Sequence, residues 1–172
     1  MIEVTLPKEY GYVLLMTIWI AFQCYLTGFL VAQPKRFQFF NRDFMKKNFE
    51  ELHHNEVSKN QPVPDQGYPD MGSGRYSEKL TYKQWFELNL AQRVHQNFLE
   101  QILPIVLLTL VAGIKYPTQT VISGAAYSLG RFIMALGYSK KVEGRVVGVT
   151  MLNISAAVIV YFATMSMVNI KE

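Results

Sequence analysis

The sequence predicts an all-α integral membrane protein whose chain folds as a bundle of four transmembrane helices. Two long segments, residues 10–32 and 146–168, contain no charged residue. Each is as long as the roughly 20 apolar residues that a helix needs to cross a hydrocarbon layer about 30 Å thick. The chain of 172 residues is 50% apolar, and a polar stretch between the two segments keeps its average hydropathy low.

The first of these segments, residues 10–32, follows a short head that carries two glutamates and one lysine. A secretory signal peptide has a basic head and an apolar core of only about 7–15 residues. We therefore expect residues 10–32 to remain in the protein as a membrane anchor.

Two further segments predict the inner helices. Residues 102–114 are apolar but too short to span a membrane alone, so the second helix, residues 85–114, must begin near Trp85 and include polar residues. The third helix, residues 117–138, is interrupted by one charge, Arg131. With the fourth helix at 146–168, we expect a single membrane domain over residues 1–172.

The loop between the first two helices, residues 33–81, is polar and contains the turn-favouring stretch QPVPDQGYPDMGSG. Residues 41–57 are compatible with a short amphipathic helix that places Phe44 and Phe49 at the membrane surface. Two adjacent histidines end this segment, but a structural metal site needs four ligands at defined spacing. We therefore predict no metal, and nothing in the chain indicates nucleic-acid binding.

Basic residues predict the orientation of the chain. They are concentrated after the first and third helices: Lys35, Arg36, Arg42, Lys46, Lys47, Lys59, Arg75, Lys79, Lys140, Lys141 and Arg145. The opposite side carries only Lys8, Lys115 and Lys171. The positive-inside rule places both basic loops in the cytosol or the mitochondrial matrix. No targeting signal distinguishes the endoplasmic reticulum from the mitochondrial membrane.

The second helix carries a polar stripe in an apolar setting. Arg93, Asn97 and Glu100 are spaced i, i+4 and i+7, which places them on one face of an α-helix. A charge at the bilayer centre costs about 2.5–3.5 kcal/mol on insertion scales, so such residues are functional candidates. The alternative is structural, because polar side chains also join neighbouring helices at about 0.6 kcal/mol per contact.

The third helix adds a second set of polar residues. Arg131 has Tyr127 one turn before it and Tyr138 two turns after it on the same face, and Arg145 follows the helix. Guanidinium groups bind carboxylates through paired hydrogen bonds. The combination predicts a pocket near the cytosolic ends of the helices that binds an anionic, water-soluble ligand.

These residues carry a resemblance to a known family. The run QRVHQNFLE contains R-x-x-x-N-x-x-E on a second membrane helix, and GRFIMALGY follows on the third. With the opening LPKEYGYVLL, the chain resembles the membrane-associated proteins in eicosanoid and glutathione metabolism (MAPEG). Within that family the fit is best to the microsomal glutathione S-transferase type 3 subgroup.

The resemblance implies a homotrimer that binds glutathione, as a co-substrate, between adjacent subunits. Arg93, Asn97 and Glu100 would hold the polar groups of glutathione, with further contacts from Arg131 and Tyr138. Arg36 would contribute from the neighbouring subunit, and Arg145 would be the catalytic residue that activates the thiol. A lipophilic second substrate would arrive from the membrane lipid and be conjugated or, as a lipid hydroperoxide, reduced.

The chain also departs from the family pattern. Met134 and Gln101 stand where several branches carry tyrosine, and residues 38–66 resemble an insertion. Two hypotheses therefore remain open. The first is a membrane glutathione S-transferase or peroxidase. The second is a non-catalytic accessory subunit with the same fold in a larger membrane complex, for example a mitochondrial one.

Overall fold

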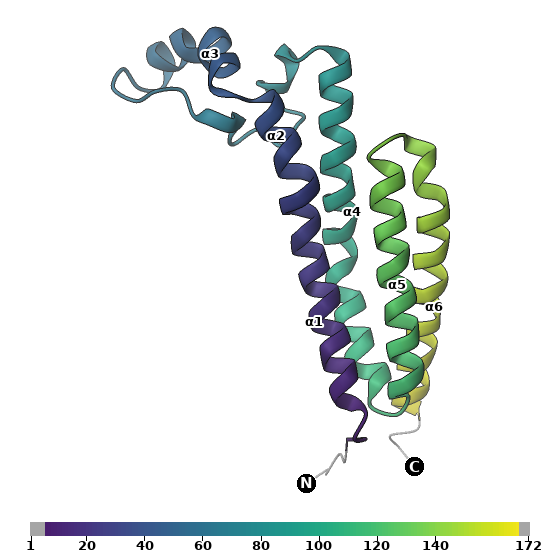
Figure 1. Cartoon of the computed structure of the whole chain (residues 1–172). Helices are drawn as coiled ribbons and strands as arrows, with labels where there is room; N and C mark the ends of the chain where they lie inside the picture. The colour runs from purple at the N-terminus through teal and green to yellow at the C-terminus, as the bar shows by residue number, and fades with distance from the viewer. Residues whose placement is uncertain (1–5, 169–172) are drawn as a thin grey trace. The chain divides into compact units, whose positions relative to one another are not determined.

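The computed structural model describes residues 6–168, and every regular element in that range is helical. Four helical stretches are long and apolar enough to cross a membrane: Tyr10–Phe39, Tyr82–Gly113, Pro117–Tyr138 and Val142–Val168. The prediction of an all-α chain with four such helices is confirmed (Figure 1).

The helical elements follow one another in a simple order. They are α1 (Tyr10–Thr27), a π-helical turn (Gly28–Ala32), α2 (Gln33–Phe39), α3 (Arg42–Glu56), two 3-10 turns (Asp65–Gly67 and Ser77–Lys79), α4 (Tyr82–Gly113), α5 (Pro117–Tyr138), a third 3-10 turn (Val142–Arg145) and α6 (Val146–Val168). The chain divides into two compact units. One comprises the residues up to Leu26 and from Gln96 onward, and the other is Thr27–His95.

In the first unit, α5 and α6 form an antiparallel pair, side by side, joined by a short connection (Figure 1). Glycines make their contact close. A Cβ atom on Gly148 would lie 2.2 Å from the backbone nitrogen of Met134 and 2.6 Å from the carbonyl oxygen of Gly130. One on Gly137 would lie 2.0 Å from the carbonyl oxygen of Gly144. Lipid supplies no hydrophobic force between helices, so such backbone contact, with its dispersion attraction, stabilises the pair.

The helices of this unit are also joined by polar contacts. The Trp19 indole on α1 donates to the Ser128 hydroxyl on α5 at 2.8 Å, and the Gln23 amide donates to the Ser128 carbonyl at 2.9 Å. At the far end of α4, Tyr10 donates to the carbonyl of Leu110, and Ser166 on α6 donates to that of Ala112. Hydrogen bonds of this kind join helices where no water competes for the donors.

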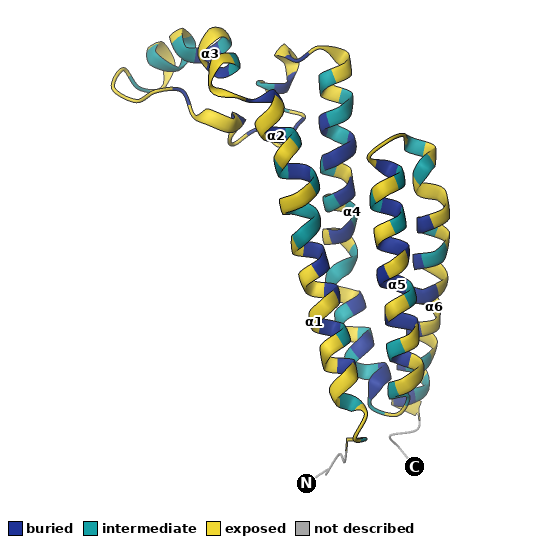
Figure 2. Ribbon diagram, in the orientation of Figure 1, coloured by how far each residue is buried: buried dark blue, intermediate teal, exposed yellow. Residues whose placement is uncertain are grey.

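The outer faces of these helices are apolar. Figure 2 shows that exposed residues recur along α1, α5 and α6. On α1 they include Leu14, Leu15, Ile18, Phe22 and Tyr25. A contiguous apolar surface of this extent is unfavourable in water but matches the hydrocarbon of a bilayer.

The second unit has a hydrophobic core of its own. Its buried members come from α2, α3, the loop and the start of α4: Phe39, Phe40, Met45, Phe49, Val63, Leu80 and Leu88. Phe44 packs against them, and Phe49 makes an edge-to-face contact with Tyr76. Residues 41–57 were expected to place Phe44 and Phe49 on or near the membrane surface, but Phe49 is buried in this core and Phe44 is partly buried against it, because the chain itself covers the apolar face of α3.

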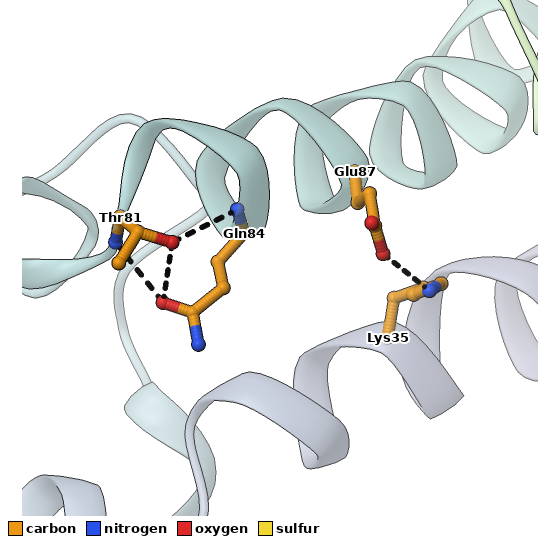
Figure 3. Close-up of polar contacts among 4 residues, drawn as sticks. All are labelled: Lys35, Thr81, Gln84 and Glu87. Atoms are coloured by element: carbon orange, nitrogen blue, oxygen red, sulfur yellow. Dashed lines mark hydrogen bonds and ion pairs between the residues drawn. The ribbon is translucent and has the colours of Figure 1, made fainter.

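The start of α4 is fixed by a capping box (Figure 3). The backbone N–H of Thr81 donates to the Gln84 amide oxygen at 3.0 Å, and the backbone N–H of Gln84 donates to the Thr81 hydroxyl at 3.4 Å. This pairing satisfies N–H groups that a helix end leaves open. It explains why α4 begins at Tyr82, ahead of the expected start near Trp85. An ion pair between Lys35 and Glu87, 2.8 Å long, joins α2 to α4.

Two buried charges organise the loop of the second unit. The Arg36 guanidinium donates to the carbonyl oxygens of Gln66, Gly67 and Asp70, and it lies 4.3 Å from the centre of the Tyr68 ring. The Asp70 carboxylate accepts from the backbone N–H groups of Gly72, Gly74 and Ser77 and from the Ser77 hydroxyl. Backbone groups in this loop thus find partners without regular secondary structure.

A first prediction concerns the α5–α6 contact. Gly148→Ala should lower the free energy of unfolding by about 1–3 kcal/mol, because the added Cβ meets backbone rather than a flexible side chain. Thermal unfolding of the purified protein in detergent measures the change. Gly11→Ala is the control, since nothing lies within 4 Å of a Cβ atom there. Equal melting temperatures for the two variants would contradict the close helix contact.

A second prediction concerns pH. Burial raises the pKa of the Asp70 carboxyl, but hydrogen bonds from Ser77, Gly74 and Gly72 together lower it more, so this pKa lies below the ordinary value of 3.8. Its contribution to stability is therefore complete above pH 3.8 and is lost as the pH falls through the lower folded value. Asp70→Asn should cost about 1–3 kcal/mol at neutral pH, because an amide nitrogen faces N–H donors.

Thermal unfolding, measured from neutral to acidic pH, compares the wild type with the Asp70→Asn variant. The difference in melting temperature between wild type and Asp70→Asn should shrink on acidification. Asp65→Asn, at an exposed carboxylate of the same loop, serves as the control and should follow the wild type. A difference between wild type and Asp70→Asn that does not change with pH would show that the carboxylate's charge is not what stabilises the loop.

Candidate functional site

A pocket of about 450 Å³ lies within the first unit, among α4, α5 and α6. Its lining residues are Asn97, Glu100, Gln101, Arg131, Met134, Arg145, Val146, Val149, Thr150, Leu152 and Asn153. Four residues that the sequence nominates for ligand binding or catalysis are therefore brought together here: Asn97, Glu100, Arg131 and Arg145. A wider hollow of about 850 Å³ runs along α3 alone, and its lining residues include none of those predicted to bind the ligand or to act in catalysis.

Three elements position these side chains. Asn97 and Glu100 lie on α4, Arg131 lies on α5, and Arg145 ends the 3-10 turn that leads into α6. The close approach of Gly137 and Gly144 fixes that turn against the end of α5. Arg145 follows directly, and its guanidinium carbon lies 5.2 Å from the centre of the Tyr138 ring. The backbone contact between α5 and the turn thus determines where the second cation of the pocket stands.

Arg131 is the most deeply buried cation of the pocket, with only 3% of its surface exposed. Its Nε and Nη2 atoms donate to the Tyr127 hydroxyl at 2.9 and 2.8 Å, and Nη2 also donates to the Gln101 amide oxygen. Nη1 has the Met134 sulfur at 3.8 Å, and the Phe98 ring centre lies 4.3 Å from the guanidinium carbon. Five N–H groups in a fixed planar fork are therefore held in one orientation.

The partners of the Arg131 guanidinium are neutral groups. Over residues 6–168, its hydrogen-bonding partners are a phenol, an amide and a thioether, and no carboxylate lies within 4 Å of it. A thioether is a weak acceptor, so Nη1 retains most of its capacity to donate. A buried cation is stable only when a counter-charge or strong hydrogen bonds replace its hydration. The arrangement is suited to an anionic ligand in the pocket.

The other members of the pocket differ in exposure. Glu100 and Arg145 are exposed in the single chain, whereas Asn97 is half-buried. Tyr138 is buried and contacts Arg145 with its ring without lining the pocket. The pocket thus combines one deep guanidinium, one accessible guanidinium, one carboxylate and three amides. This set complements a molecule that carries both positive and negative charges.

Two of the residues predicted to bind the ligand belong to the second unit. Arg93 lies on α4 one turn before Asn97 and is exposed. Arg36 is 3% exposed, and its N–H groups donate to the loop carbonyls described above. Within its own chain, Arg36 therefore holds the loop. Neither residue lines the pocket of the first unit.

Sequence reasoning missed several lining residues. Gln101, directly after Glu100, has no predicted role in ligand binding, yet it lines the pocket and contacts Arg131. Thr150 and Asn153 add polar groups to an otherwise apolar α6 wall. An amide inside an uncharged membrane span was the available signal for Asn153, because unpaired polar groups are costly there.

The described part of the chain contains no group of side chains suited to binding a metal ion. Between residues 6 and 168, no three His, Cys, Asp or Glu side chains are grouped so that they could hold a metal ion.

A third prediction concerns the support of Arg131. Tyr127→Phe removes the oxygen that accepts from two nitrogens of a buried guanidinium. We expect a loss of about 1–3 kcal/mol in the free energy of unfolding, measured by thermal unfolding in detergent. Tyr138→Phe is the matched control, because over residues 6–168 its hydroxyl makes no hydrogen bond. A destabilisation by both variants to the same degree would contradict the role given to Tyr127.

Comparison with known proteins identifies the family. The model of the MAPEG family matches residues 11–166, which is almost the whole chain. No curated protein and no solved structure matches the chain. The match includes the complete pocket and all but the outermost residues of the four apolar helices. The chain is therefore an integral membrane protein that belongs to the MAPEG family.

Proposed function

We propose that this protein is a membrane-bound glutathione S-transferase or glutathione-dependent peroxidase that acts on apolar electrophiles or lipid hydroperoxides. The observation that carries the proposal is the buried Arg131, which lines a pocket with Asn97, Glu100 and Arg145 and whose hydrogen-bonding partners among residues 6–168 are all neutral. Membership in the MAPEG family supports glutathione as the ligand.

The groups of glutathione match those of the pocket. The tripeptide carries two carboxylates, one ammonium group, two peptide bonds and a thiol. The Arg131 guanidinium suits a carboxylate, the Glu100 carboxylate suits the ammonium group, and the Asn97 amide suits a peptide bond. Arg93, on the preceding turn of α4, and Tyr138 remain predicted contacts of the same ligand.

Arg145 is the candidate for thiol activation. A free thiol has a pKa of about 8.5, and its thiolate is the nucleophile. A guanidinium held near the sulfur favours the thiolate, because opposite charges within about 4–6 Å stabilise the ionised form. Arg145 is exposed at the pocket and its guanidinium lies over the Tyr138 ring, so it is accessible to the sulfur of a bound ligand.

Both proposed reactions use the same nucleophile. In conjugation, the thiolate sulfur forms a bond to an electrophilic carbon, and the leaving group departs with the electron pair. In peroxide reduction, the sulfur takes the terminal oxygen of the hydroperoxide and the alkoxide leaves and is protonated. A second glutathione then condenses with the sulfenic acid, which gives the disulfide and water.

The second substrate would approach along α6. Val146, Val149 and Leu152 give the pocket an apolar wall on a helix whose outer face is itself apolar. An apolar molecule dissolved in the membrane can reach such a wall without passing through water. We propose that this wall accommodates the hydrocarbon part of the second substrate.

We also propose how the subunits assemble and how the chain is oriented in the membrane. A homotrimer would place a neighbouring subunit at the exposed Glu100 and Arg145, and it could bring the neighbour's Arg36 to the ligand, as the family resemblance implies. The basic loops would face the cytosol or the matrix, where glutathione is available.

A fourth prediction tests the proposed function. The purified protein in detergent should conjugate glutathione to an apolar aryl halide or reduce a lipid hydroperoxide. Arg145→Ala should lower kcat about tenfold or more, while calorimetry shows glutathione affinity within about twofold of wild type. Lys141→Ala removes a neighbouring exposed cation outside the pocket lining and should leave kcat unchanged.

The outcomes separate the parts of the proposal. An inactive wild-type protein that still binds glutathione would remove the enzymatic role. Full activity in Arg145→Ala would remove the role of Arg145 in thiol activation. A wild-type protein that neither binds nor turns over glutathione would overturn the proposed function.

A further inference from the structure

Gln101 occupies an unusual position beside the buried cation. Its amide oxygen accepts a hydrogen bond from Nη2 of Arg131 and another, 3.3 Å long, from the Tyr127 hydroxyl. The Tyr127 oxygen in turn accepts from Nε and Nη2 of Arg131. The three side chains therefore form a closed network in which each contacts the other two.

The chemistry of the network fixes the direction of the amide. A guanidinium carries only donors, so the oxygen of Gln101 must face it, and the amide nitrogen must point elsewhere. Gln101 is half-buried and lines the pocket. Over residues 6–168, its side-chain nitrogen makes no hydrogen bond of its own.

We infer that Gln101 is a positioning residue, which holds the Arg131 guanidinium in the pocket without cancelling its charge and so makes the pocket selective for an anionic group of the ligand. The inference rests on the proposed function, because glutathione is the ligand through which it is tested. It concerns a residue for which the sequence predicts no role in ligand binding or catalysis.

A neutral acceptor is the essential feature. A carboxylate at the same place would accept the same hydrogen bonds, but it would form an ion pair with Arg131 and compensate its charge. In surroundings of low dielectric constant, such a pair is strong enough to compete with an anionic ligand. The Gln101 amide orients the Arg131 guanidinium. Because the amide has no net charge, the guanidinium still attracts an anionic ligand.

A side chain without a hydrogen-bond acceptor in place of Gln101 would fail to position Arg131 for a different reason. Tyr127 alone holds the Nε side of the fork, and Met134 offers only a weak acceptor to Nη1. Without the Gln101 oxygen, the Nη2 side would lose an acceptor, and the fork could rotate about its remaining contacts. The charge would then persist, but its direction toward the ligand would not be fixed.

The experiment compares glutathione binding by calorimetry in the full-length protein in detergent. Gln101→Glu keeps the shape and the acceptors and adds a charge, so the dissociation constant should rise about tenfold or more. Gln101→Leu removes the acceptor without adding charge and should raise it about threefold to tenfold. Gln119→Glu and Gln119→Leu make the same changes at an exposed glutamine of α5 outside the pocket lining. Both control variants should keep the dissociation constant for glutathione within about twofold of the wild-type value.

A double-mutant cycle shows whether Gln101 acts through Arg131. In an Arg131→Gln background, Gln101→Leu should have no further effect on the dissociation constant, because the group it positions is gone. An equal effect in both backgrounds would show that Gln101 contacts glutathione directly or acts only on the fold, and would overturn the inference. Unchanged binding in Gln101→Glu would overturn it as well.

Two checks keep these outcomes distinct. Each variant is compared with wild type by thermal unfolding and gel filtration, and Gln101→Met replaces Gln101→Leu should the leucine variant aggregate. A wild-type protein that binds no glutathione overturns the proposed function and this inference together. Wild-type binding with an unaffected Gln101→Glu variant overturns the inference alone.

Discussion

The positive charge of Arg131, buried among neutral partners, is the constraint on which the pocket depends. A guanidinium in this position loses its hydration, and the protein replaces it with a phenol, an amide, a thioether and the face of an aromatic ring. These neutral groups satisfy the geometry of the N–H donors and do not cancel the charge. Asn97, Glu100 and Arg145 line the same pocket, whose deepest charge is that of Arg131.

The position of that charge depends in turn on backbone contact. Helices in lipid associate through dispersion and hydrogen bonding, so the distance between them is set by the smallest side chains at their interface. Gly130 and Gly148 allow α5 and α6 to meet backbone to backbone, and Gly137 and Gly144 do the same where the helices are joined. A pocket lined from both helices therefore has its width determined by residues that carry no functional group.

The sequence predicted those features that depend on one segment at a time. Uncharged length identified the outer spans, and helical periodicity placed Asn97 and Glu100 on one face of α4. Features that depend on a partner elsewhere in the chain were not predictable in this way. Phe49 belongs to a core only because α2, the loop and the start of α4 cover it. The role of Gln101 required knowledge that Arg131 lies beside it, which no spacing within α4 can give.

The second unit has consequences for how this chain tolerates change. Among the described residues, 6–168, the partners of its aromatic cluster, its capping box and the two buried charges of its loop all lie within residues 27–95. The core of this unit hides its apolar side chains, as the core of a water-soluble protein does. The long apolar helices follow the opposite rule, because large apolar side chains are exposed along them. A substitution at an exposed position of residues 42–76 therefore leaves the buried cluster and the buried charges of the loop with their partners.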